Sequence, residues 1–101
     1  MAFVKVCEAN ALKPGEALKF EAPRAIAVFR VDDEFFATDD TCTHAQSSLS
    51  DGYIDGDVVE CAFHGAKFCV RTGKVLSLPA TEALKTFAVK VEDGSVFVDP
   101  D

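Results

Sequence analysis

The sequence predicts an all-β protein built from short strands, arranged as a small sandwich or barrel. Runs rich in β-branched and aromatic residues alternate with turn-forming residues along the whole chain, and no segment keeps a helical period for long. The dipeptide Asp93-Gly94, which lies between two such runs, is a strong signal for a tight hairpin. At 101 residues the chain is expected to form one domain, residues 1–101, with a modest core.

The strands expected in the N-terminal half end at the turn formers Pro14-Gly15, Pro23 and Asp32-Asp33. Between the first two strands, Glu8–Leu12 is expected to form one helical turn, which Pro14-Gly15 ends. The four expected strands are Phe3–Cys7, Ala17–Glu21, Ala25–Val31 and Glu34–Thr38.

The C-terminal half is expected to continue as a series of hairpins. Turns are predicted at Ser50-Asp51-Gly52, Asp55-Gly56, Thr72-Gly73 and Asp93-Gly94. The expected strands, of which the last two pair across Asp93-Gly94, are Val58–Val59, Lys67–Arg71, Lys74–Leu78, Lys85–Val91 and Val96–Asp99.

Two short segments, Cys42-Thr43-His44 and Cys61-Ala62-Phe63-His64, carry the strongest functional signal. They contain the only two histidines of the chain, and each histidine closely follows a cysteine. Cysteine thiolates and histidine imidazoles are metal ligands. Two sulfur and two nitrogen ligands in paired loops fit an iron–sulfur cluster in which histidines replace two cysteines on one iron. The candidate cofactor and metal ligands are therefore Cys42, His44, Cys61 and His64.

A structural zinc site is the main alternative for these four residues, as part of a zinc or protein-interaction module. Common zinc spacings group cysteine with cysteine and histidine with histidine. Here each loop is mixed, and Cys42 and His44 are only two positions apart, which fits two neighbouring metals better than one tetrahedral centre. The other two cysteines, Cys7 and Cys69, lie outside the paired loops and are expected to be small buried side chains.

The chain is acidic, with 17 Asp and Glu against 10 Lys and Arg. Nucleic acid is an improbable partner, because phosphate binding needs a basic surface. Nine acidic residues and no basic residue lie between positions 32 and 60. This acidic stretch fits either a solvated face or an electrostatic docking surface for a basic partner. Its members are Asp32, Asp33, Glu34, Asp39, Asp40, Asp51, Asp55, Asp57 and Glu60.

No membrane association is expected, because no run approaches the roughly 20 apolar residues that a membrane-spanning helix needs. The first residues contain no basic segment followed by an apolar stretch, as an export signal would. Four cysteines without an export signal favour metal binding over disulfides. The expected location is the cytoplasm.

The pattern C-x-H…C-x-x-H resembles the Rieske family, and the resemblance extends over nearly the whole chain. It implies one 2Fe–2S cluster per chain, with Cys42 and Cys61 on the inner iron and His44 and His64 on the outer iron. It also implies three small antiparallel sheets, with a cluster-binding subdomain at about residues 41–79.

Within that family, the segments Cys42–Tyr53 and Val59–Val75 are similar to the ferredoxin components of biphenyl- and naphthalene-type ring-hydroxylating dioxygenase systems. The resemblance implies an electron carrier in aromatic hydrocarbon degradation, whose partners are a flavin-dependent ferredoxin reductase and a terminal ring-hydroxylating oxygenase. The chain is not expected to be an enzyme. A Rieske oxygenase also needs a mononuclear iron held by two further histidines and a carboxylate, and no third histidine exists here.

Both ligand loops depart from the respiratory type of Rieske protein. That type carries an additional disulfide at positions matching Ser47 and Phe63, and hydroxyl donors to the cluster sulfurs at positions matching Ala66 and Phe68. Without these hydroxyls the reduced cluster is less stabilised, so a low potential is expected. Gly65 and Gln46 are expected to let the backbone turn closely and to aim N–H groups at the sulfurs, with an ordinary turn residue as an equal alternative for Gln46. Partners are expected to dock over Gln46, Phe63 and Pro79, the last in a third loop, Ser77-Leu78-Pro79.

Overall fold

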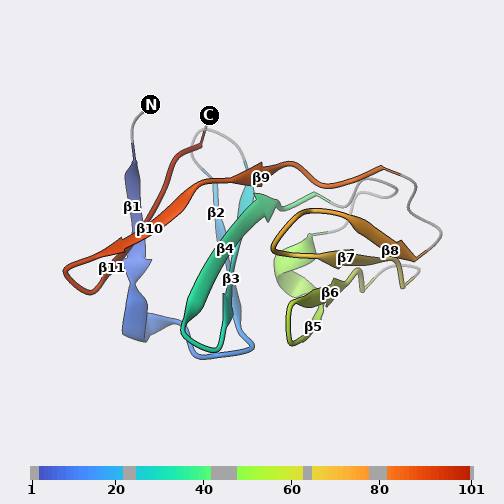
Figure 1. Cartoon of the computed structure of the whole chain (residues 1–101), viewed down its shortest axis with the longest axis horizontal. Coiled ribbons are helices and arrows are strands. Elements are labelled where there is room, and N and C mark those ends of the chain that lie inside the picture. Colours follow the sequence, from blue (N-terminus) through green and yellow to red (C-terminus); the bar gives the residue numbers. More distant parts are fainter. Residues whose placement is uncertain (1–2, 22–24, 42–47, 63–64, 78–81, 101) are drawn as a thin grey trace.

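Three antiparallel β-sheets make up the fold of the computed structural model, which describes residues 3–21, 25–41, 48–62, 65–77 and 82–100. The first sheet has the order β1 (Val4–Glu8), β11 (Ser95–Val98) and β10 (Val89–Glu92). The central sheet has the order β2 (Ala17–Phe20), β3 (Ile26–Val31), β4 (Glu34–Asp39) and β9 (Thr86–Phe87). The third sheet has the order β5 (Tyr53–Asp55), β6 (Val58–Glu60), β7 (Lys67–Cys69) and β8 (Val75–Ser77). The prediction of an all-β protein with three small sheets is confirmed (Figure 1).

Strand β3 is buried on both of its faces and separates two hydrophobic cores. Successive side chains of a strand point to opposite faces of its sheet. Accordingly Ala27, Phe29 and Val31 face a core shared with the third sheet, whereas Ile26 and Val28 face a core shared with the first sheet. The central sheet lies between the other two in Figure 1, so its middle strand needs apolar residues throughout.

Two single turns of 3₁₀ helix, Ala9–Ala11 and Leu49–Asp51, are the helices of the described residues. The first confirms the helical turn expected within Glu8–Leu12. Neither has the length or the apolar character that crossing a bilayer would need.

One predicted strand was wrong, and one strand was missed. Lys85–Val91 was expected to be continuous, but it is interrupted at Ala88. Its first part, Thr86–Phe87, pairs with Ala37 and Thr38 of β4 in the central sheet. Its second part, β10, pairs with β11 in the first sheet, so the chain changes sheets at the interruption. The missed strand is β5, a three-residue edge strand that is too short to show an alternating pattern.

Arg71 connects the third sheet to the central sheet. Its guanidinium lies 3.0 Å from Glu34 Oε1 at the start of β4 and 3.2 Å from Asp57 Oδ2 before β6. It also stacks over the ring of Phe36, 4.7 Å from the centroid. The hydrogen bond to Glu34 raises the pKa of Arg71, so the guanidinium is charged at all relevant pH values.

Candidate metal centre

The described residues include the ends of both candidate ligand loops. Of the four predicted ligands, Cys61 is described, whereas Cys42, His44 and His64 lie outside the described residues. The predicted neighbours Gln46, Ser47, Phe63, Leu78 and Pro79 also lie outside them. The site is therefore built from the segments that support each loop.

The first loop, residues 42–47, begins and ends at a closed backbone junction. Thr41 and Ser48, which flank the loop directly, form an antiparallel bridge. The N–H of Leu49 donates to the carbonyl oxygen of Asp40 at 2.6 Å, and the N–H of Asp40 donates to Ala25 at 3.1 Å. The described residues on the two sides of positions 42–47 are thus joined to each other next to the end of β4.

The carboxylate of Asp40 reinforces this junction. Its side chain is only 2% exposed. The Ser48 hydroxyl donates to Oδ2 at 2.5 Å, and the N–H of Ser50 donates to Oδ1 at 2.9 Å. The ammonium of Lys19 lies 3.8 Å from Oδ2. The sequence placed Asp40 only in the acidic stretch, because its serine partners lie eight and ten positions later, beyond the reach of a local turn motif.

The second loop starts inside the apolar core rather than in a polar network. Cys61 is 1% exposed, and the N–H of Cys61 donates to the carbonyl oxygen of Ala66 at 2.7 Å. The N–H of Gly65 donates back to the carbonyl oxygen of Cys61 at 3.2 Å. Gly65 has a φ of +74°, which confirms the expected close turn, whereas the expected N–H donor to a cluster sulfur stays a prediction.

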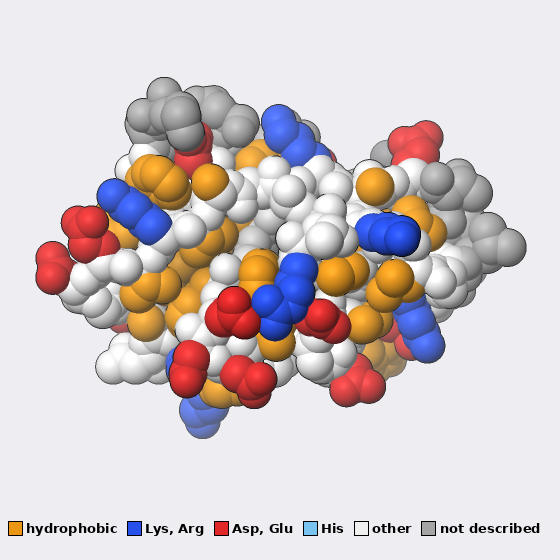
Figure 2. All heavy atoms as spheres, viewed as in Figure 1, with side chains coloured by type: hydrophobic (Ala, Val, Ile, Leu, Met, Phe, Trp, Pro, Cys, Tyr) orange, Lys and Arg blue, Asp and Glu red, His pale blue; other side chains and the backbone are white. Residues whose placement is uncertain are grey.

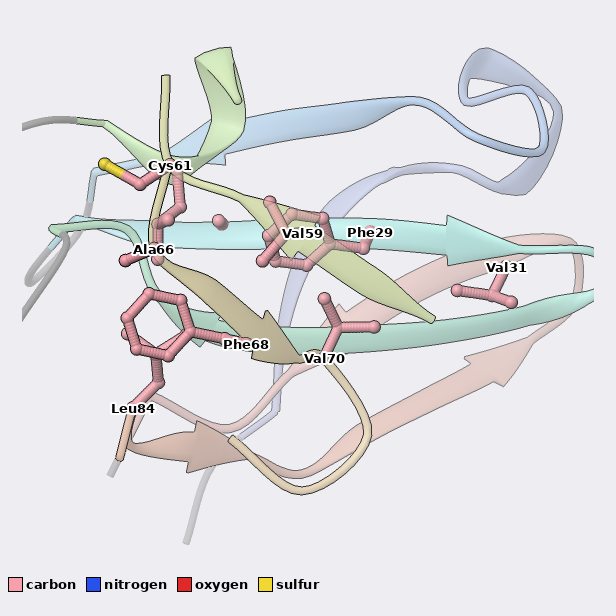
Figure 3. Packing of buried hydrophobic residues seen from close by; sticks show 10 residues of the cluster. Phe29, Val31, Val59, Cys61, Ala66, Phe68, Val70 and Leu84 are labelled. Atoms are coloured by element: carbon pink, nitrogen blue, oxygen red, sulfur yellow. The ribbon is translucent and has the colours of Figure 1, made fainter. Parts of the chain in front are cut away.

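Cys61 packs with Ala66 and Phe68, both fully buried, and its sulfur points away from Phe29 and Val31 (Figure 3). These neighbours offer no side-chain hydroxyl. A cysteine at the edge of a buried apolar cluster fits an iron–sulfur site, since thiolate is the usual protein ligand of such clusters. The surroundings of the described ligand therefore fit the expected cofactor.

The described residues that flank the two loops contact one another. Leu49, which follows the first loop, lies in the same buried cluster as Cys61 and Ala66. The backbone of Gly52 passes so close to Glu60 that a β-carbon at Gly52 would overlap the carbonyl oxygen of Glu60. Glu60 directly precedes Cys61. The segment after the first loop is therefore held against the start of the second loop by the packing of Leu49 and by the close backbone contact between Gly52 and Glu60.

The segment after the third loop is also attached to the third sheet. The N–H of Leu84 donates to the carbonyl oxygen of Gly73 at 2.8 Å, and the Leu84 side chain enters the core beside Phe68. Ser77, at the start of the third loop, accepts a hydrogen bond from the N–H of Lys67 at 3.2 Å. Both flanks of residues 78–81 are thus fixed to β7 and the turn that follows it.

The acidic stretch does not form one uninterrupted surface. Asp40 is buried, Glu34 and Asp57 bind Arg71, and Glu60 lies 4.0 Å from Lys67. On the face shown in Figure 2, basic and acidic side chains are interspersed with hydrophobic ones. Two members are exposed and form no ion pair with any described residue: Asp51, in the 3₁₀ turn after the first loop, and Asp55, at the end of β5 away from Cys61. The acidic residues that could form either a solvated face or a docking surface are therefore fewer than the nine that the sequence indicated.

Cys7 and Cys69 are half-buried rather than fully buried, and both are free thiols. Burial raises the pKa of the Cys7 thiol, and the nearby charge of Glu8 acts in the same direction. A raised pKa keeps the thiol protonated and poorly nucleophilic at neutral pH. Cys7 lies in the core on the far side of the central sheet from Cys61.

A family profile for the Rieske [2Fe-2S] domain matches residues 2–88. The chain belongs to this family. The resemblance predicted from the two loops is confirmed, and the cofactor of the family is the 2Fe–2S cluster.

Curated relatives agree with this assignment along nearly the whole chain. The chain is 56% identical over 98% of its length to the biphenyl 2,3-dioxygenase ferredoxin component of Rhodococcus jostii (strain RHA1), of which 94% is covered. It is 52% identical over 98% of its length to the biphenyl dioxygenase ferredoxin subunit of Pseudomonas sp. (strain KKS102), of which 93% is covered.

A solved structure shares the fold. It is described as the complex of reduced oxygenase and oxidized ferredoxin in carbazole 1,9a-dioxygenase. One of its chains superposes with a TM-score of 0.91 at 47% identity, covering 95% of this chain and 91% of that chain.

Proposed function

We propose that this protein is a cytoplasmic one-electron carrier that passes electrons from a flavin-dependent ferredoxin reductase to a terminal ring-hydroxylating oxygenase in aromatic hydrocarbon degradation. The observation that carries the proposal is the 56% identity, over 98% of the chain, to the ferredoxin component of a biphenyl dioxygenase. The carbazole dioxygenase complex, in which a ferredoxin and an oxygenase occur together, supports the oxygenase as the electron acceptor. The protein itself acts as the electron-transfer component and not as an enzyme.

The ligands in this proposal are Cys42 and Cys61 on the inner iron and His44 and His64 on the outer iron. When bound, the cluster supplies reversible one-electron chemistry. The chain's own residues position and protect it: Asp40 and Ser48 close the first loop, and the apolar packing around Cys61 excludes water from the second. We assign these ligands to a cluster-binding subdomain of about residues 41–79 within a single domain.

The residues around Cys61 also bear on the potential. Ala66 and Phe68 are fully buried and occupy the positions at which respiratory Rieske proteins carry hydroxyl donors. With a methyl group and an unsubstituted ring at these positions, added negative charge receives no hydrogen bond from either side chain. The proposed potential is therefore low, as suits a carrier that receives electrons from a flavin.

Metal and sulfide analysis tests this proposal directly. The purified protein is expected to contain two irons and two acid-labile sulfides per chain and to absorb visible light. Cys42→Ser and Cys61→Ser should abolish cluster assembly, whereas Cys7→Ser and Cys69→Ser, the matched controls, should keep the wild-type spectrum. One equivalent of zinc without sulfide would establish the structural zinc alternative instead.

Reconstitution tests the partners. Reductase, this protein and a candidate oxygenase are combined, and oxidation of an aromatic substrate is measured. Turnover should require all three components, and the Cys61→Ser protein should not substitute for the wild type. Turnover of equal rate without this protein would contradict its role as the carrier.

A further inference from the structure

Asp40 is the one fully buried carboxylate beside a candidate ligand loop among the described residues. It follows the last residue of β4 and precedes Cys42 by two positions. Burying a carboxylate is costly unless hydrogen bonds and an opposite charge compensate. A buried carboxylate whose oxygens are hydrogen-bonded therefore indicates a specific structural role, since a charge that only keeps the protein soluble would lie on the surface.

The carboxylate oxygens bind two different residues that follow the loop. Oδ2 accepts the hydrogen bond of the Ser48 hydroxyl at 2.5 Å, and Oδ1 accepts that of the Ser50 N–H at 2.9 Å. The Ser48 hydroxyl also lies 2.8 Å from the Ser50 hydroxyl, so the two serines and the acid form one network. Lys19 of β2 supplies the opposite charge at 3.8 Å from Oδ2.

The backbone of Asp40 is fixed as firmly as its side chain. Its N–H donates to Ala25 and its carbonyl oxygen accepts from Leu49, which anchors the residue between β3 and the first turn of 3₁₀ helix after the loop. Apart from the contact between the two serine hydroxyls, every bond of this network joins the residues before the loop to residues after it or to the central sheet. Removing the carboxylate would weaken the attachment of the loop exit to its backbone bonds alone and leave the strand that leads into the loop.

We propose that Asp40 is a positioning residue, whose buried carboxylate fixes the geometry of the first ligand loop and thereby the orientation of Cys42 and His44 on the cluster. The inference rests on the proposed function, because it concerns the same ligands. Charge-assisted hydrogen bonds are well suited to this task, since they are short and directional. The alternative is that Asp40 contributes only to the stability of the fold.

The test compares three loaded proteins with the wild type: Asp40→Ala, Asp40→Asn and Asp93→Asn. Asparagine can accept from the Ser50 N–H and donate to the Ser48 hydroxyl, so it preserves the network without the charge. Asp93→Asn removes one carboxylate at the exposed β10–β11 turn and is the matched control for net charge. The measurements are the electron paramagnetic resonance spectrum of the reduced protein, which reports ligand orientation, and the rate of cluster loss to excess EDTA.

We expect Asp40→Ala to broaden or shift the resonance spectrum and to accelerate cluster loss about tenfold, as follows from losing charge-assisted bonds at the loop exit. Asp40→Asn should largely restore both properties, and Asp93→Asn should match the wild type. A folded Asp40→Ala protein that retains no cluster also supports the proposal. A wild-type spectrum and rate of cluster loss in folded Asp40→Ala would overturn it.

If far-ultraviolet circular dichroism shows that Asp40→Ala does not fold, Ser48→Ala decides, because it removes the Oδ2 hydrogen bond and the contact with the Ser50 hydroxyl but leaves the carboxylate in place. A changed spectrum in Ser48→Ala supports the positioning role, and an unchanged one overturns it. Failure of the proposed function has a different signature, since the wild-type protein itself would then lack two irons and two sulfides.

Discussion

The two ligand loops are supported by opposite kinds of interaction. The first is closed by a buried carboxylate, two serines and backbone hydrogen bonds. The second begins at a cysteine that is part of the hydrophobic core, with Ala66 and Phe68 beside it. Hydrogen bonds fix direction, whereas apolar packing fixes position and excludes water. The comparison indicates that the first loop depends on a few specific bonds and the second on the integrity of the core.

The largest expected effect concerns the core under the second loop. Phe68→Ala removes a fully buried ring and should lower the free energy of unfolding by about 3–5 kcal/mol. Because the cavity lies beside Cys61, the visible spectrum of the cluster should change as well. The measurements are chemical denaturation of the loaded protein and its absorption spectrum.

Phe87→Ala is the matched control, because Phe87 belongs to the core on the other face of the central sheet. It should destabilise the fold by a similar amount, about 3–5 kcal/mol, without changing the spectrum. Equal spectral changes in both variants would mean that the cluster spectrum depends on the overall stability of the fold and not on the packing beside Cys61.

The contact between the loops is expected to give the next largest effect. In Gly52→Ala the new β-carbon would overlap the carbonyl oxygen of Glu60, so the two loop supports must move apart. Loss of about 1–3 kcal/mol of stability is expected, the usual range for overpacking, together with faster cluster loss. Gly15→Ala is the control, because a β-carbon there meets nothing within 4 Å.

Gly15 has a φ of +86°, so its substitution should cost about 1–2 kcal/mol through the backbone alone. Cluster loss from Gly15→Ala should proceed at the wild-type rate. If Gly52→Ala and Gly15→Ala lost the cluster equally fast, the close approach at Glu60 would not set the spacing of the loops.

Much of this arrangement could be predicted from the sequence because its signals are local. Alternating apolar runs and the Asp93-Gly94 turn predicted the hairpin of β10 and β11, and the mixed cysteine–histidine loops predicted the family. The change of sheet at Ala88 could not be predicted, since it depends on the pairing of Thr86–Phe87 with β4, about 50 residues earlier. The burial of Asp40 could not be predicted either, because aspartate is usually exposed and its partner Lys19 lies on a different strand.

A smaller effect is expected from restoring hydroxyls near Cys61. Ala66→Ser and Phe68→Tyr each place a hydroxyl at a buried position beside the second loop. If these positions face the cluster sulfurs, each variant should raise the reduction potential by roughly tens of millivolts, since one hydrogen bond contributes about 1 kcal/mol. Protein-film voltammetry measures the change, and Phe29→Tyr, deeper in the same core, serves as the control. Unchanged or lowered potentials in both folded variants would refute this assignment.

The smallest expected effect concerns the approach of a partner, and it separates the two interpretations of the acidic stretch. Two exposed members are not paired with a described residue. Asp51 lies in the 3₁₀ turn that contains Ser50, beside the polar support of the first loop, whereas Asp55 ends β5 at the turn to β6, away from Cys61. Reversing both to lysine should slow electron transfer to the oxygenase about two- to fivefold at low ionic strength, because steering by opposite charges is lost. The potential should remain nearly unchanged, since exposed charges are well screened by water.

Stopped-flow reduction measured across a salt series distinguishes steering from structural damage. Salt should shrink the difference between the variant and the wild type, because the Debye length falls to about 10 Å at 0.1 M. The matched control reverses Glu92 and Asp93 at the exposed β10–β11 turn of the first sheet, which changes net charge equally outside the acidic stretch. Equal rates for wild type and both variants in dilute buffer would show that the acidic stretch is a solvated face. Equal slowing by both variants would show that net charge, and not a docking surface that includes Asp51 and Asp55, governs the approach.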